Sequence, residues 1–93
     1  MTASLESKVT IPSDVLFREV AGEAVLLNLA TGKYFGLDAV GTRMWALLAE
    51  HSQVAPAYHA LLAEYDVSAD QLRHDLLTLV DNLSANALLQ IND

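Results

Sequence analysis

The stretch that decides the fold is VLLNLATGKYFGLDAVGTRMWALLAE, residues 25–50. Residues 25–28 are an apolar run of strand length, and Thr31-Gly32 is a two-residue hairpin signal. Residues 33–37 follow with two consecutive aromatic side chains, which favour a half-buried pleated surface. The stretch therefore predicts two antiparallel strands around a glycine turn.

The pattern changes to a helical one at Asp38. The short carboxylate of this residue is suited to accept a hydrogen bond from the first free N–H groups of a helix, which is expected over about residues 38–50. Its apolar residues, at helical spacing, are Val40, Met44, Trp45, Leu47 and Leu48. A strand that ends at a helix cap leaves an exposed edge, and such an edge can bind an extended peptide through main-chain hydrogen bonds.

The remaining elements complete one small domain. Residues 15–20 resume an apolar pattern and turn at Ala21-Gly22 into the next strand, which gives a three-stranded antiparallel meander. A second helix is expected over about residues 54–65, with Pro56 tolerated in its first turn. Strands first and helices afterwards predict an α+β fold, in which three helices cover one face of a small sheet.

The third expected helix opens at Ser68, and Gln71 lies at the spacing of a capping-box partner. Asn86 offers its end, after which a short apolar tail is expected to fold back on the body. The apolar stripe of the helix consists of Leu72, Leu76, Leu79, Val80 and Leu83, and the tail contains Leu88, Leu89 and Ile91. Acidic residues opposite the stripe are typical of a solvated helix face.

Length and composition limit the domain organisation. The 93 residues are enough for one core, expected over residues 14–93, whereas the polar residues 1–13 lack a sustained period and are expected to form a flexible N-terminal arm. The start shows no signal-peptide pattern and no apolar run approaches membrane-spanning length, so a cytoplasmic protein is expected. The absence of cysteine excludes disulfides.

No constellation of residues predicts catalysis. The histidines His51, His59 and His74 lie on three different elements without metal-ligand spacing, and the serines occur in no nucleophile-elbow sequence. The four glycines are isolated, so no phosphate-binding loop is present. We therefore expect no enzymatic activity, no metal and no cofactor.

Charge separates two classes of binding protein. Five Lys and Arg against twelve Asp and Glu give a net charge of −7, which repels a nucleic-acid backbone. A winged-helix DNA-binding or regulatory protein is the alternative function, because it uses the same order of strands and helices. Its recognition helix would have only Arg73 and His74 against Asp70, Asp75 and Asp81, so a peptide partner is favoured.

The strand at residues 33–37 has features suited to a peptide partner. Tyr34 and Phe35 are consecutive and point to opposite faces, so one of them lies near the outer surface, where plain exposure and ligand contact both remain open. Gly36 removes a side chain from the same edge, which would let another backbone come close.

Almost the whole domain, from about residue 15 to residue 91, resembles the PqqD family. These are small proteins named for pyrroloquinoline quinone biosynthesis, and they recur as recognition elements in pathways of ribosomally made, modified (RiPP) peptides. The residues that carry the resemblance are Thr31-Gly32, Tyr34-Phe35, Asp38, Gly41, Met44-Trp45 and Asp75-Leu76. One departure is Asn86-Ala87, where the family usually has Gly before the last apolar pair.

The resemblance implies a winged helix-turn-helix-like fold and a non-catalytic adaptor. The leader segment of a precursor peptide would add as a fourth strand to the strand holding Tyr34, beside the third helix. The adaptor would present it to a maturation enzyme, a radical SAM enzyme in quinone cofactor synthesis or a leader peptidase in lasso peptide synthesis. The expected peptide-binding residues are Lys33, Tyr34, Phe35, Gly36, Leu72, Asp75, Leu76 and Leu79. If those leucines are core instead, Arg73, Leu77 and Val80 are the alternative groove lining.

Overall fold

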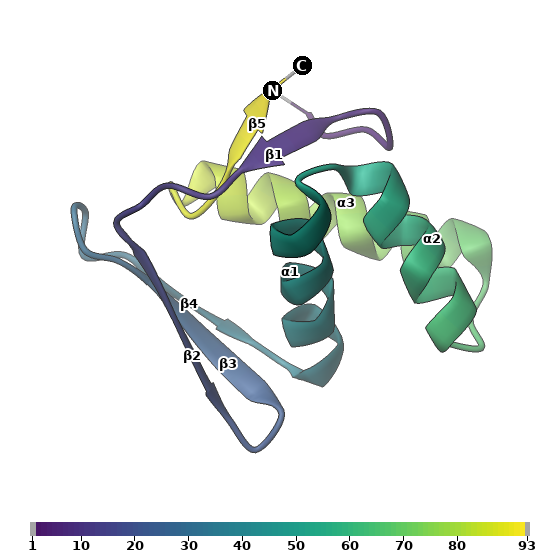
Figure 1. Ribbon diagram of the computed structural model, residues 1–93, viewed down its shortest axis with the longest axis horizontal. Helices are drawn as coiled ribbons and strands as arrows, with labels where there is room; N and C mark the ends of the chain where they lie inside the picture. Colours follow the sequence, from purple (N-terminus) through teal and green to yellow (C-terminus); the bar gives the residue numbers. More distant parts are fainter. Residues whose placement is uncertain (1, 93) are drawn as a thin grey trace.

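Three antiparallel strands lead into three helices, and a second, two-stranded sheet joins the two ends of the chain (Figure 1). The computed structural model describes residues 2–92. The elements are β1 Lys8–Thr10, β2 Val15–Val20, β3 Glu23–Asn28, β4 Tyr34–Leu37, α1 Ala39–His51, α2 Val54–Glu64, α3 Ala69–Ala85 and β5 Gln90–Asn92. The sheet order β2-β3-β4 confirms the predicted meander and the α+β class.

The helices begin where short polar side chains cap them. Asp38 Oδ1 accepts a hydrogen bond from the backbone N–H of Gly41 at 2.8 Å, and Ser68 Oγ accepts one from the N–H of Gln71 at 3.1 Å. The Gln71 side chain does not complete a capping box, because its amide donates to Asp75 Oδ1 at 2.8 Å instead. Both predicted helix starts are thus confirmed, and only the reciprocal side-chain bond differs.

The core lies between the inner face of the β2-β3-β4 sheet and the apolar sides of the helices. The fully buried large side chains include Leu26, Leu48, Leu61, Leu76 and Leu83. In α3, four of the five predicted stripe residues are buried and Leu79 is half-buried. Val40, one of the apolar residues at helical spacing in α1, is 41 % exposed, because it lies in the first turn of the helix, directly after the end of β4.

The two ends of the chain pair with each other. In β1, Val9 is opposite Ile91 of β5 and only 3 % exposed, and the backbone N–H of Ala3 donates to Asp81 Oδ1 of α3 at 2.7 Å. Residues Lys8–Thr10, within the segment expected to be an N-terminal arm, thus form a strand that the sequence pattern did not predict. Its partner strand lies some eighty positions away, beyond the reach of local patterns. The predicted folding back of the tail is confirmed by the burial of Leu88 and Leu89.

The two hairpins of the main sheet have different loops. Ala21 and Gly22 both have positive φ, 55° and 84°, which defines a two-residue type I′ turn between β2 and β3. The β3–β4 loop instead spans residues 29–32, closed by a hydrogen bond from the Asn28 N–H to the Lys33 carbonyl at 2.9 Å. The Thr31-Gly32 signal lies inside this loop, so the loop is longer than the two residues predicted.

The β2–β3 turn predicts a stabilising substitution. Ala21 carries a Cβ in the left-handed region, whereas Asn adopts that conformation more readily and Asn-Gly is the preferred type I′ pair. We expect Ala21→Asn to raise the free energy of unfolding by about 0.5 to 1 kcal/mol in urea denaturation. Ala21→Val should lower it, since β-branched residues tolerate positive φ poorly; a more stable Val variant would contradict the turn assignment.

Candidate functional site

The free edge of β4 presents unpaired main-chain groups. Antiparallel pairing places Phe35 opposite Leu26 and Leu37 opposite Ala24. Because the N–H of Asn28 donates to Lys33, the alternation of hydrogen-bonded pairs makes Phe35 and Leu37 direct their N–H and C=O groups toward β3. Tyr34 and Gly36 consequently direct theirs away from the sheet.

The side chains of β4 alternate in the same way. Leu37 is buried and Phe35 half-buried against the core, whereas Tyr34 is 76 % exposed on the outer side. The prediction that Tyr34 and Phe35 take opposite faces is confirmed. A Cβ built at Gly36 meets no atom within 4 Å, and Lys33, just before the strand, is exposed. Backbone and space are therefore both open along this edge.

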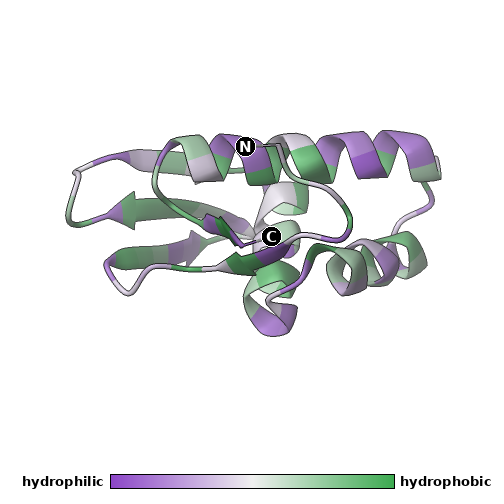
Figure 2. Ribbon diagram, turned by 90° about the horizontal axis from the view of Figure 1, so that it is seen from above, coloured by the Kyte–Doolittle hydropathy of each residue, from purple (hydrophilic) through white to green (hydrophobic). Residues whose placement is uncertain are grey.

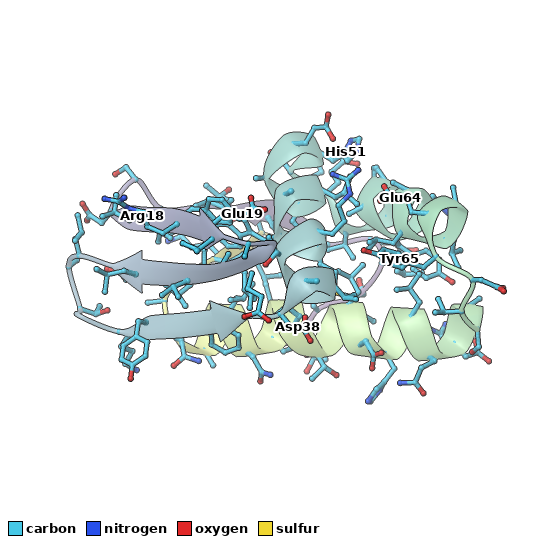
Figure 3. The ribbon with its side chains drawn as sticks, turned by 90° about the horizontal axis from the view of Figure 1, so that it is seen from below. Arg18, Glu19, Asp38, His51, Glu64 and Tyr65 are labelled. Atoms are coloured by element: carbon cyan, nitrogen blue, oxygen red, sulfur yellow. The ribbon has the colours of Figure 1, made fainter. Side chains whose placement is uncertain are left out.

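A shallow pocket of about 360 Å³ lies where β4 ends and α1 begins, facing α3. Figure 3 shows Asp38 at this junction. The pocket is lined by Asp38, Val40, Gly41, Met44, Asp75 and Leu79. Apolar side chains from two helices thus form a hollow that carries two carboxylates, and neither carboxylate forms a salt bridge with any residue between 2 and 92.

The predicted helix residues divide between the pocket and the core. Asp75 and Leu79 line the pocket, whereas Leu72 and Leu76 are 4 % and 0 % exposed and are packed in the core. Leu72 and Leu76 are four residues apart and form one row along α3, whereas Asp75 and Leu79, also four apart, form the neighbouring row that borders the pocket.

The alternative lining of the third helix is not near this pocket. Val80 is fully buried, and Arg73 and Leu77 border the N-terminal segment on another side of α3. α1 contributes two further lining residues, the exposed Val40 and the buried Met44, which the sequence placed only among the apolar residues of the helix. The sequence feature that could have identified them is the helix start directly after β4, which places the first turn of α1 beside the strand end.

A second polar contact lies away from this edge. Arg43 of α1 donates two hydrogen bonds to Glu64 of α2, at 2.8 and 2.7 Å. This contact lowers the pKa of Glu64 and raises that of Arg43. Both side chains are solvent-exposed, so the pair orients α1 and α2 and contributes little to stability.

Between residues 2 and 92, no three His, Asp or Glu side chains come together as a metal-binding group. Within the same residues, no helix has the length and apolar character to cross a membrane.

Comparison with known proteins decides the family. The family model of PqqD, described as coenzyme PQQ synthesis protein D, matches residues 23–89. The chain belongs to the PqqD family. A comparison of this family member with curated proteins found no match.

Two solved structures are similar to this PqqD-family chain. TbiB1, in complex with the TbiA(beta) leader peptide, is 40 % identical with a TM-score of 0.80, over 86 % of this chain and 93 % of TbiB1. A lasso peptide synthetase B1, complexed with its leader peptide, is 21 % identical with a TM-score of 0.77, over 88 % of this chain and 96 % of its own. At 21 % identity, the second structure shows that the two chains share a fold.

The placement of the α3 leucines predicts opposite results for two matched substitutions. Leu76→Asp would bury an unpaired carboxylate in the core, so we expect loss of the folded state in circular dichroism and thermal melting. Leu79→Asp puts the same charge at the half-buried pocket wall and should leave a cooperatively folded domain. A folded Leu76→Asp variant would contradict the assignment of Leu76 to the core.

Proposed function

We propose that this protein binds the leader segment of a ribosomally synthesised precursor peptide as a fourth strand on β4, and presents it to a maturation enzyme. The observation that carries the proposal is the free β4 edge, with the outward main-chain groups of Tyr34 and Gly36, beside the pocket lined by Asp75 and Leu79. The structures of both relatives were solved with leader peptides, which supports the same ligand class here.

Main-chain pairing supplies the affinity. Tyr34 and Gly36 each offer one N–H donor and one C=O acceptor to an added strand. Each net hydrogen bond contributes about 0.5 to 1.5 kcal/mol, and the space around Gly36 is open even to an added Cβ. These bonds are available to any extended peptide, so they do not by themselves select the leader.

Selection comes from the pocket at the end of the strand. Val40, Met44 and Leu79 give it apolar walls, and Asp38 and Asp75 add negative charge. A leader side chain with an apolar stem, next to or ending in a positive charge, complements this lining. The same acidic character, together with the net charge of −7, opposes binding to DNA.

The opposite edge of the sheet is a poorer site. By the same alternation, Val15, Phe17 and Glu19 direct their N–H groups away from β3 on the outer edge of β2. Phe17 is stacked on Trp45 of α1, with ring centroids 6.5 Å apart. None of the three lines the pocket between the end of β4, α1 and α3, so an added strand there would lack the contacts that this pocket offers.

The residues at the β4 edge suit an adaptor and not an enzyme. Residues for covalent chemistry are not assembled at the β4 edge, whose lining is apolar, acidic or main-chain. We propose a cytoplasmic, non-catalytic protein whose partners are the precursor and one maturation enzyme, a leader peptidase or a radical SAM enzyme. The leader peptidase is favoured by the likeness to TbiB1 and to the lasso peptide synthetase B1.

Proline at position 36 tests strand addition. Gly36→Pro removes an outward N–H without touching the β3 ladder, whereas Gly36→Ala keeps that N–H and adds only a methyl group in open space. With the TbiA(beta) leader peptide as probe, we expect calorimetry to show at least tenfold weaker binding for the Pro variant and a change within threefold for the Ala variant.

The matched control is Glu19→Pro, which removes an outward N–H from the opposite edge of the same sheet. Circular dichroism must show that all three variants are folded. Equal weakening by Glu19→Pro and Gly36→Pro would contradict β4 as the binding edge, and so would full binding by Gly36→Pro.

The non-catalytic role predicts an unchanged ligand. After prolonged incubation of the TbiA(beta) leader peptide with this protein alone, mass spectrometry should recover the peptide at its starting mass. Any cleavage or mass shift that scales with protein concentration, and that survives repurification of the protein, would refute the adaptor role.

A further inference from the structure

The outer face of the β2-β3-β4 sheet is apolar and uncovered. Directly paired residues share a face, so Leu16, Leu27 and Tyr34 form one row across the three strands, and Arg18, Val25 and Gly36 form the next. Val20 follows in the row beyond and is 77 % exposed. We call this set the outer face: Leu16, Arg18, Val20, Val25, Leu27 and Tyr34.

No helix covers the outer face within residues 2–92. Figure 3 shows the three strands side by side, with Arg18 labelled on β2, and Figure 2 colours much of β2 and β3 as hydrophobic. Val25 is 47 % exposed although it lies in the central strand. Proteins rarely leave a contiguous apolar patch in water except at an interaction site.

Charge selects the occupant of the outer face. A hollow on its open end is lined by Arg18, Val20 and Val25 together with the carboxylates of Glu23 and Asp38. Two acidic residues and one basic residue, Arg18, thus border an apolar centre, and the whole chain carries −7. A second copy would bring the same charge, and nucleic acid and anionic lipid are repelled as well. A protein surface with an apolar centre and a basic rim is complementary.

We infer that the outer face is the docking surface for the maturation enzyme, an inference that rests on the proposed function. The leader would join the sheet at β4, so its alternate side chains would continue the rows that end at Tyr34 and Gly36. The enzyme would then contact a single surface, made partly of this protein and partly of the bound leader. Such a composite surface couples recognition of the leader to recruitment of the enzyme.

Two matched substitutions separate docking from leader binding. Val25→Lys places a charge at the centre of the outer face, and Val67→Lys makes the same change on the α2–α3 connection, where the valine is equally exposed, 48 % against 47 %. In the source strain deleted for this protein, the test records which mature peptide masses disappear and which return with each variant. The purified variants are titrated with the TbiA(beta) leader peptide.

We expect Val25→Lys to restore less than a tenth of the lost product while its affinity for the leader peptide stays within twofold of the unsubstituted protein. Val67→Lys should restore product fully. Normal product with Val25→Lys would overturn the docking inference and leave leader binding intact, and parallel loss of leader affinity would overturn it too. If deletion removes no product, or Gly36→Pro restores it, the proposed function itself fails.

Sedimentation velocity tests whether a second copy of this chain occupies the outer face. The unsubstituted protein should sediment as a monomer at concentrations where it supports maturation. A dimer that Val25→Lys dissociates would assign the outer face to a second copy and would overturn its assignment to the enzyme.

Discussion

The buried side chain of Asn28 fixes the geometry on which the rest of the structure depends. It is 4 % exposed at the end of β3, its backbone N–H bonds to the Lys33 carbonyl, and its Oδ1 accepts from the N–H groups of Ala30 and Thr31. Its Nδ2 donates to the carbonyl of Ala87, just after α3. One amide thereby sets the register of β4 and attaches the sheet to the end of the helix beside it. Without these partners, burial of the amide would lower the free energy of unfolding by about 1 to 3 kcal/mol for each unsatisfied group.

From that register follow three surfaces with different character. The inner face of the sheet is closed by the helices, the β4 edge keeps the main-chain groups of Tyr34 and Gly36 open, and the outer face stays apolar and bare. Affinity from main-chain pairing and selection by a small pocket suit a protein that binds a leader without altering it. A one-residue slip of β4 would move its core-facing side chains to the outer face and its outer side chains into the core, since the side-chain period of a strand is two.

Local patterns predicted the elements well because each had a local cause. Caps at Asp38 and Ser68, the positive-φ turn at Ala21-Gly22 and the opposite faces of Tyr34 and Phe35 all depend on residues close in sequence. The strand pair β1–β5 could not be found in this way, since three-residue strands carry little pattern and their partners are far apart.

The candidate site was predicted only in part for a related reason. The period of α3 identified its apolar stripe, but a period cannot say which apolar residues reach the margin of the core. Leu72 and Leu76 were therefore grouped with Leu79, although only Leu79 reaches the pocket. Val40 and Met44 share that pocket with Asp75 and Leu79 because α3 borders the start of α1, a tertiary arrangement that neither helix reveals alone. The bond from Asn28 to Ala87 likewise spans 59 positions.

The central claim is that β4 accepts an added strand through alternate backbone groups, and amide hydrogen exchange resolved by residue tests it most directly. The N–H groups of Phe35 and Leu37 are already bonded to β3, whereas those of Tyr34 and Gly36 are free. With saturating TbiA(beta) leader peptide, exchange at Tyr34 and Gly36 should slow by at least tenfold relative to the free protein. Unchanged exchange at both residues, with new protection on β2 or the N-terminal segment instead, would contradict the account.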